Sequence, residues 1–502
     1  MTAAAPPKAG RREWIGLAVL ALPCLLYAMD LTVLNLAVPS LTADLSPSAT
    51  ELLWIIDIYG FLVAGSLITM GTLGDRIGRR RLLMIGAAAF GAVSVLAAFS
   101  TSPGMLIAAR ALLGLAGATV APSTLSLIRN MFLDPKQRAT AVGIWITSYS
   151  IGGAVGPFVG GVLLEHFWWG SVFLASVPIM VLILLAAPIL LPEYRDPQAG
   201  QLDIPSAALS LVAILAVIYG LKQIAAHGVS WLSPASLALG LLAGLAFVRR
   251  QRRLAAPLID LTLFRGRAFT AALAAYLLAT FVAFGSYVFI AQYLQLVLGL
   301  SPLHAGVWTL PFMLAFIIGS NVSPLIARRF PARAVVTGGL AVAAVGFLAI
   351  TRVDGPATLP VLVVASFVFS LGLSPAFTLG TDMMIGAAPP EQAGAAAALS
   401  ETGSELGGAL GIAILGSLGT AVYRRALDAQ LPAGVPSAAA DAARETLGAA
   451  RSVATGLPGD LGVELLDAAR AAFTQAMAAT AVICAGVAIA TALLTAGLLR
   501  RA

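Results

Sequence analysis

Long apolar stretches recur along nearly the whole chain, and they restrict its fold more than any other feature. Fourteen of them are about 20 residues long, the length that a helix needs to cross a bilayer. Each is continuous rather than alternating, so the pattern predicts helices and not a membrane barrel. Their approximate bounds are 14–38, 51–70, 82–100, 104–128, 139–163, 170–191, 204–226, 232–249, 268–297, 302–327, 333–351, 358–385, 394–421 and 473–499.

The composition favours a membrane protein and excludes an ordinary soluble enzyme. Of the 502 residues, 59% are apolar and 11% are charged, whereas about 25% are charged in soluble domains. We therefore expect an all-α integral membrane protein. Cys24 and Cys484 lie in separate apolar stretches and the three histidines are scattered, so we expect no disulfide, no metal site and no cofactor. No nucleophile–base pair or phosphate loop indicates an enzyme.

Basic residues cluster in alternate loops between the stretches. With both termini in the cytoplasm, most of the 30 Lys and Arg residues fall on the inner side, including Arg11, Arg12 and Arg79–Arg81. This positive-inside pattern predicts the orientation, and it accounts for the net charge of +7 without a nucleic acid partner. A signal peptide is the alternative for the first stretch. Because the stretch runs from Trp14 to Leu41 without a small-residue cleavage site, we expect an uncleaved helix.

The stretches group as six, two and six. A cytoplasmic N-terminus at 1–13 precedes a six-helix bundle at 14–191, two additional helices at 204–249 and a second six-helix bundle at 268–499. The loop GTLGDRIGRRRLL of the first bundle has a weak echo, ARRFPARAVV, in the second, and such repeats indicate a transporter with its site between the halves. We expect the polar segment 423–472, between helices 13 and 14, to be an extracytoplasmic helical hairpin broken near Gly456. A disordered loop is the alternative.

Four carboxylates lie within the apolar stretches: Asp30, Asp57, Glu401 and Glu405. An ionised side chain at the membrane centre costs about 2.5–3.5 kcal/mol on insertion scales, so we expect these groups to bind protons or cations. Glu401 and Glu405 are four residues apart and share one helix face. Two carboxylates so close do not easily ionise together, so one of them is expected to hold a proton near neutral pH.

Each of these groups also has a structural interpretation. Asp30 could accept hydrogen bonds in a polar packing seam, and Asp57 could lie in the outer mouth of its helix. The two glutamates could belong to a solvated helix start, because Pro389 and Pro390 precede them. Arg110, a cation inside the fourth stretch, should find a carboxylate, a backbone carbonyl or water. That pairing would either couple protonation to substrate binding or be simply structural.

The sequence GTLGDRIGRRR, between the second and third stretches, combines a tight turn with charges. Gly71 and Gly78 permit a sharp turn and close helix approach. Asp75 can cap a helix N-terminus, and Arg76 and Arg79 can anchor at the cytoplasmic headgroups. A generic basic loop is the alternative.

Small residues thin one side of the fifth stretch, at Gly152, Gly156 and Gly160, and Pro157 bends it. Small residues allow close helix packing in lipid. We expect this seam to close one end of the protein while the halves rock. Ordinary small-residue packing is the alternative, and the two are compatible.

These motifs together resemble the major facilitator superfamily, and within it the fourteen-helix drug:proton antiporter family of quaternary-ammonium and multidrug exporters. Gly74 stands where the superfamily loop usually has Ala, and Ala175 and Ser176 depart from the family pattern. The matching segments are Asp30–Pro39 (DLTVLNLAVP), Gly71–Arg81, LIAARALLGLAGA around Arg110, Ser150–Gly161 (SIGGAVGPFVGG), Trp169–Pro178 (WGSVFLASVP) and Leu399–Gly416 (LSETGSELGGALGIAILG).

The resemblance implies the major facilitator fold and a monomeric, multi-pass protein of a bacterial cytoplasmic (inner) membrane. It also implies a proton antiporter that exports amphipathic, mainly cationic compounds, such as quaternary ammonium compounds, dyes and biguanides, by alternating access. Its partners would be protons, these small molecules and the lipid bilayer. A narrow exporter of an endogenous metabolite or antibiotic is the first alternative, and a non-transporting membrane sensor is a remote one.

Overall fold

The computed structural model describes residues 7–195, 203–227, 230–254, 257, 261, 263–387 and 393–498, and every regular element in them is helical. The first group comprises α1 (Arg11–Leu45), α2 (Ala49–Ile77), α3 (Arg79–Ala98), α4 (Pro103–Gly117), α5 (Val120–Met131), α6 (Pro135–His166), α7 (Ser171–Leu174) and α8 (Val177–Leu190). A pair follows, α9 (Ile204–His227) and α10 (Leu232–Gln251). The last group comprises η1 (Leu263–Arg265), α11 (Arg267–Gln292), η2 (Tyr293–Val297), α12 (Pro302–Ala327), α13 (Ala332–Ile350), η3 (Pro356–Thr358), α14 (Leu359–Ala387), α15 (Ala393–Gln430), α16 (Ser437–Glu445), α17 (Leu447–Ala454) and α18 (Leu461–Leu498).

Within these described residues, 13 helical segments are long and apolar enough to cross a membrane. The remaining predicted span coincides with α9, whose apolar part, Ile204–Gly220, is shorter. Two predicted spans are interrupted: α4 and α5 divide one, and α7 and α8 divide the other. Pro122 and Pro178 lie just after these breaks. Because proline has no N–H to donate to the preceding turn, it weakens the continuous hydrogen-bond ladder that the apolar pattern predicts.

Polar residues set the helix ends. Ser48 and Glu51 form a capping box at the start of α2: the Ser48 backbone N–H donates to Glu51 Oε2 at 3.0 Å, and the Glu51 N–H donates to Ser48 Oγ at 3.3 Å. Asp134 accepts a 2.9 Å hydrogen bond from the Gln137 N–H at the start of α6. Gly78, at φ 110°, ends α2 and starts α3, a conformation that favours glycine.

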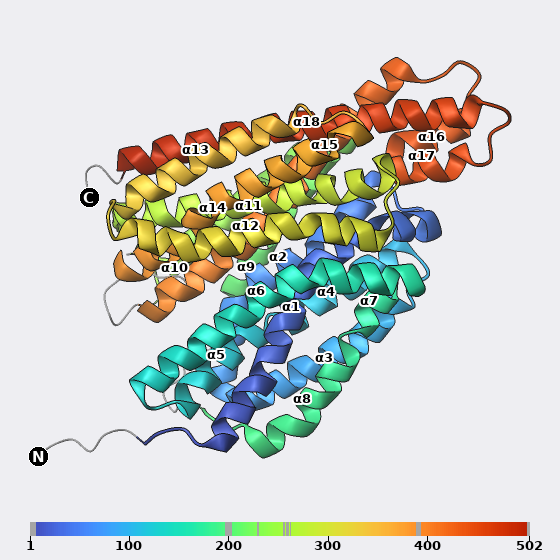
Figure 1. The fold of residues 1–502 in the computed structure, drawn as a ribbon. Coiled ribbons are helices and arrows are strands. Elements are labelled where there is room, and N and C mark those ends of the chain that lie inside the picture. Colours follow the sequence, from blue (N-terminus) through green and yellow to red (C-terminus); the bar gives the residue numbers. More distant parts are fainter. Residues whose placement is uncertain are drawn as a thin grey trace, which may run out of the picture.

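The helices form two bundles, α1–α8 in one half and α11–α18 in the other, as the blue-to-green and yellow-to-red ribbons of Figure 1 show. In the first half, Gly152, Gly156 and Gly160 of α6 back onto α1. In the second half, Gly403, Gly407 and Gly411 of α15 back onto α11 at the same four-residue spacing, mainly against Leu273, Leu277 and Phe281. Each half therefore contains an equivalent closely packed helix pair, α1 with α6 in the first and α11 with α15 in the second.

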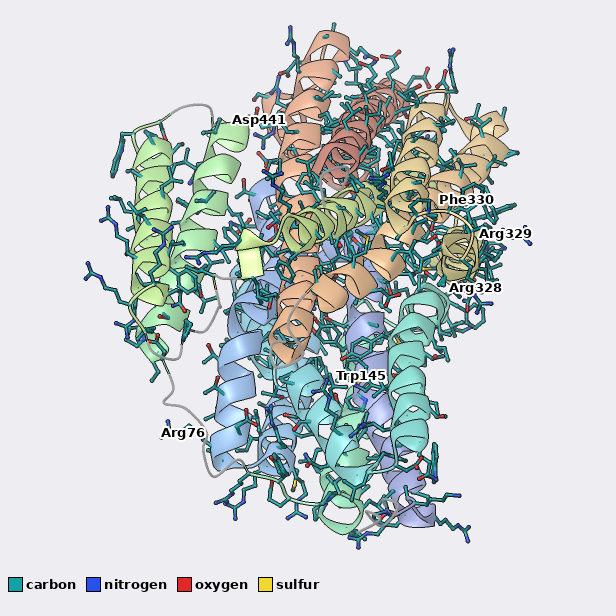
Figure 2. The ribbon with its side chains drawn as sticks, turned by 90° about the vertical axis from the view of Figure 1, so that its left-hand side faces the viewer. Arg76, Trp145, Arg328, Arg329, Phe330 and Asp441 are labelled. Atoms are coloured by element: carbon teal, nitrogen blue, oxygen red, sulfur yellow. The ribbon has the colours of Figure 1, made fainter. Side chains whose placement is uncertain are left out.

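The pair α9 and α10 lies beside the bundles, where Figure 2 shows it as a green hairpin. Within the pair, Gly240 of α10 packs against Val217 of α9. Towards the bundles, α9 packs on α2 and α15, where Ile218 joins Phe61 and Ala409 in one apolar cluster. The pair therefore covers one side of the seam between the halves.

Candidate functional site

A buried ion pair anchors the centre of the first half. Arg110 lies in α4 and is 1% exposed, and its Nη1 donates to Asp30 Oδ2 of α1 at 2.6 Å. The Arg110 Nε donates to the Ile55 carbonyl of α2 at 3.1 Å. The guanidinium carbon lies 4.6 Å from the centre of the Tyr59 ring, within cation–π range. Arg110 therefore links α4 to α1 and α2. Its partners are the Asp30 carboxylate and a backbone carbonyl.

A cavity adjoins this pair at the interface between the halves. It has a volume of about 30 Å³ and is lined by both halves: Leu34, Asn35, Ile56, Asp57, Gly60 and Arg110 from the first, and Phe284, Ser404, Glu405, Gly408, Ala409 and Ile412 from the second. A space of this size holds a water or two but no drug-sized molecule. A larger ligand would have to separate the halves.

Asp57 lies buried beside Arg110 and not in an outer mouth, one of the two positions that its sequence left open. It is 1% exposed and lines the cavity together with Arg110 and Glu405. Asp57 is about 12 Å from the N-terminal end of α2, and Asp30 is about 22 Å from the C-terminal end of α1. Arg110 pairs with Asp30 and also lines the cavity with Asp57, a proximity that positions in a sequence do not reveal.

The structure places the side chain of only one of the two glutamates of α15. Glu405 lines the cavity and lies within electrostatic range of Tyr59, as do Asp30 and Arg110. The backbone of Glu401 is part of α15, but its side chain lies outside the described residues. The structure therefore brings Asp30, Asp57, Glu405 and Arg110 together, and the proposed proton sharing between the glutamates stays a prediction.

Sequence reasoning missed a series of aromatic rings beside the carboxylates. Tyr59 is fully buried, and its hydroxyl has no hydrogen-bond partner in the described part of the chain. The ring of Tyr27 is 6.0 Å from that of Tyr59 and 5.8 Å from that of Tyr149, which is 4.9 Å from that of Trp145. For Tyr27 and Tyr59, proximity to Asp30 and Asp57 in the sequence was the available signal. Figure 2 shows Trp145 within the first bundle.

The halves meet at the end of the bundle opposite the chain termini. There, Gly416 of α15 packs on Leu53 of α2, and Gly306 of α12 packs on the Pro157 backbone of α6. In the same region Ser301 Oγ donates to Glu165 Oε2 at 3.3 Å. Towards the termini the ribbons of the two halves diverge (Figure 1).

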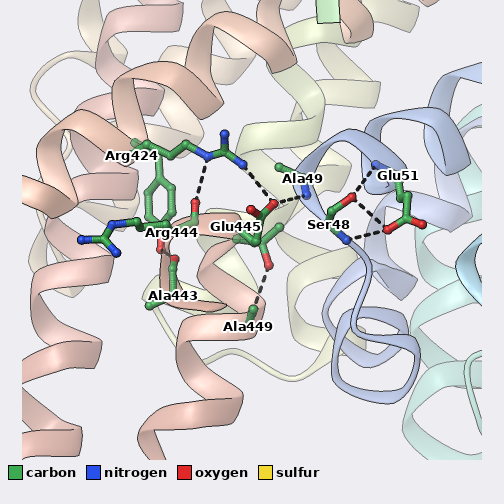
Figure 3. A network of polar contacts seen from close by, with 10 residues as sticks. Ser48, Ala49, Glu51, Arg424, Ala443, Arg444, Glu445 and Ala449 are labelled. Carbon is green, nitrogen blue, oxygen red and sulfur yellow. Dashed lines mark hydrogen bonds and ion pairs between the residues drawn. The ribbon is translucent and has the colours of Figure 1, made fainter. Parts of the chain in front are cut away.

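The segment between α15 and α18 adds a second connection at that end (Figure 3). Glu445, the last residue of α16, accepts a 2.9 Å hydrogen bond from the Ala49 N–H at the start of α2. The same oxygen accepts from Arg424 of α15 at 2.9 Å. Gly448 of α17 also packs on Thr42 of α1. The segment 423–472 thus contains helices that contact the opposite half.

The glycine-rich basic loop is held by its own ion pair. The Arg79 guanidinium lies 2.5 Å from Asp75 Oδ1, and it donates to the Pro122 carbonyl at 3.2 Å. The expectation that Asp75 caps a helix is wrong for the helix that follows it: α3 has Gly78 as its N-cap and no side-chain cap. Asp75 lies in the last turn of α2, and its carboxylate pairs with Arg79.

The other predicted loop residues lie around this pair. Arg76 is exposed, and Figure 2 shows it at the surface of the first half. A Cβ added at Gly71 would make only an ordinary contact with the ring of Pro122. A side chain at Gly78 would collide with the Glu193 carboxylate, which accepts a 3.1 Å hydrogen bond from the Arg80 N–H. Glu193, three residues after the end of α8, therefore holds the loop through its hydrogen bond with the Arg80 N–H.

The predicted glycine seam of α6 has two sides. Gly152, Gly156 and Gly160 pack on α1 within the same half. Pro157 faces the other half and contacts α12 at Gly306. Close packing and closure between the halves therefore use different residues of the same helix.

Comparisons with known proteins agree with this architecture. The model of the Major Facilitator Superfamily matches residues 20–412. The chain is 46% identical to the multidrug efflux pump LfrA of Mycolicibacterium smegmatis, over 96% of this chain and 95% of that protein. It is 39% identical to the methyl viologen resistance protein SmvA of Salmonella typhimurium, over 92% and 93%.

A solved structure shares the fold. A bacterial homolog of the human lysosomal transporter Spinster, in an inward-facing and unoccupied conformation, superposes with a TM-score of 0.68 over 98% of this chain and 99% of that chain. The sequence identity is 19%, so this similarity concerns the fold alone.

Proposed function

This chain belongs to the Major Facilitator Superfamily, and we propose that it is a proton-coupled antiporter that exports amphipathic, mainly cationic drugs by alternating access. The observation that carries the proposal is the cavity between the halves, where Asp57 and Glu405 lie beside the Arg110–Asp30 pair. The relatives named as a multidrug efflux pump and a methyl viologen resistance protein support drug export.

The charge balance of the site supports a cationic substrate. Three carboxylates (Asp30, Asp57 and Glu405) and one guanidinium (Arg110) give 1 − 3 = −2 if all are ionised. A net charge of −2 in a low-dielectric site attracts either protons or an organic cation. A proton and a cationic drug would therefore compete for the same groups, which is the requirement for exchange.

The pairing divides the roles of the carboxylates. Asp30 is held by Arg110 at 2.6 Å, so its charge is balanced in this conformation. Asp57 and Glu405 come from opposite halves, so the distance between them changes whenever the halves rock. We assign Asp57 and Glu405 to binding the proton or the drug in competition. We assign the Asp30–Arg110 pair to transmitting, within the first half, whether that site is occupied.

The cycle follows from this division. With the end near the termini open, Asp57 or Glu405 releases its proton and admits the cation. The halves then rock, and the contacts of Leu53 with Gly416 and of Pro157 with Gly306 separate. Protons from outside displace the cation. Each net charge that crosses 100 mV contributes about 2.3 kcal/mol, so exchange of two protons for one monovalent cation can drive accumulation.

Proteoliposomes containing the purified protein and a pH gradient test the proposal. We expect pH-driven movement of ethidium in the wild type and its loss in Glu405→Gln. Glu464→Gln, which neutralises an exposed carboxylate at the far end of α18, is the matched control. No pH-driven movement of any cationic dye by the wild type would refute the multidrug proposal and favour a narrow exporter. Equal rates in Glu405→Gln and the control would refute the site.

A further inference from the structure

A groove lies at the end of the α9–α10 pair that carries the C-terminus of α10. Its volume is about 500 Å³, far larger than the central cavity. Leucines line one part of it and arginines the other: Leu209, Leu242, Leu245, Ala246, Arg249, Arg250, Arg253 and Leu254. The charge pattern of the chain predicts that this end lies at the cytoplasmic face of the membrane.

One of the three arginines is already neutralised. Arg250 Nη2 lies 2.9 Å from Asp203 Oδ1, and its Nε donates to Ser206 Oγ at 3.1 Å. Ser206 in turn donates to Asp203 Oδ2. Burial raises the pKa of Asp203, but these hydrogen bonds outweigh burial and lower the pKa below its usual value. Arg250 therefore lines the groove as an already paired side chain, and its charge is balanced by Asp203.

Arg249 and Arg253 are different. Both are exposed, and among the described residues neither forms an ion pair with a carboxylate. Arg249 lies in the last turn of α10 and Arg253 just beyond its end, and both line the groove. Two guanidinium groups on the wall of one groove form a site for a doubly accepting anion such as a phosphate.

The apolar part of the groove continues along the same face. Leu242 and Leu245 are 65% and 48% exposed, and they precede Arg249 by seven and four residues. This spacing keeps all three on one side of the helix. The distance from Leu242 to Arg249 along the axis is about 10 Å, which suits the upper part of an acyl chain below a headgroup.

We propose that this groove binds an anionic phospholipid, with its phosphate between Arg249 and Arg253 and one acyl chain along Leu242 and Leu245. A basic pocket between membrane helices at the cytoplasmic face is the kind of site that takes such headgroups. The leucines exclude a free phosphate as the main ligand, because an inorganic ion gains nothing from them. The site lies on the additional pair and is independent of the central cavity.

Lipid retention by the purified protein tests the proposal. The detergent-solubilised wild type is titrated with dioleoyl phosphatidylglycerol, dioleoyl phosphatidylcholine or inorganic phosphate, and bound species are counted by native mass spectrometry. We expect one phosphatidylglycerol to bind at least about tenfold more tightly than phosphatidylcholine, and no retained phosphate. In Arg249→Ala/Arg253→Ala, that preference disappears.

The matched control is Arg328→Ala/Arg329→Ala, which removes two exposed arginines after α12 (Figure 2). It has the same charge loss and should bind phosphatidylglycerol like the wild type. Ala246→Trp keeps both arginines but fills the groove, so it should also weaken binding. Equal retention in the control and in Arg249→Ala/Arg253→Ala would overturn the proposal, as would phosphatidylcholine binding as tightly as phosphatidylglycerol. An unchanged affinity in Ala246→Trp would overturn the acyl-chain part.

Discussion

Separating Arg110 from Asp30 should destabilise the protein more than removing both together. Removing one partner of a buried ion pair leaves an uncompensated charge and costs about 3–5 kcal/mol. The two removals are not equivalent, because Asp57 and Glu405 line the same cavity as Arg110. Arg110→Met, which leaves three carboxylates without their guanidinium, should therefore cost about 4 kcal/mol, and Asp30→Leu, after which Arg110 still has two carboxylates in its cavity, about 3 kcal/mol.

The double variant Arg110→Met/Asp30→Leu removes both charges and leaves apolar groups of similar volume. Such replacements are often close to neutral. We expect its free energy of unfolding to exceed the additive value by at least about 2 kcal/mol. The assay is reversible unfolding in mixed micelles with increasing SDS, with dye transport measured on the same variants. Additive losses would contradict the pairing, and wild-type transport by the double variant would contradict its role in coupling.

Three further predictions follow from the packing and the outer contacts. Gly156→Val should reduce folded yield sharply, because a Cβ there would overlap α1, whereas Gly153→Val, with no atom within 4 Å of that position, should express normally in size-exclusion profiles. Glu445→Ala should shift the protein towards an outward-open form by up to about tenfold, measured by spin-label distances across the outer end, with Glu464→Ala unchanged. Asp203 has a lowered pKa, so its ion pair stabilises the fold above the pKa of the unfolded chain and is lost as the pH falls through the folded value. Unfolding measured from pH 6 down to about pH 3 should therefore show a smaller acid-induced loss in Asp203→Asn, and equal slopes would contradict this.

Much of the fold could be predicted from the apolar pattern, because hydrophobic length decides which segments cross a bilayer. The prediction was weaker wherever a helix is interrupted. The stretch at 104–128 reads as one span, yet it divides at Ala118 and Thr119 ahead of Pro122. Proline bends some membrane helices and breaks others, and α14 continues through Pro375. Neighbouring helices decide the outcome, and the sequence does not show them.

The site was predictable in its charges but not in its geometry. A buried Arg110 requires a partner, so a carboxylate, a backbone carbonyl or water was expected. That this carboxylate is Asp30 depends on how α1 and α4 cross. Tyr59 carries no charge, so its position two residues after Asp57 was the only sequence signal for it, and that signal is weak. Glu445 is 396 residues from the Ala49 amide that it accepts from, and a contact over that separation requires the fold.

The central claim is that protons and organic cations compete for the carboxylates of the cavity. Its most direct test is the number of protons released when a cationic dye binds the purified protein in weakly buffered detergent solution. We predict that ethidium binding to the wild type releases about one proton or more per dye, and that Glu405→Gln and Asp57→Asn each reduce the release. Dye binding without proton release, or the same release in both variants as in the wild type, would contradict the account.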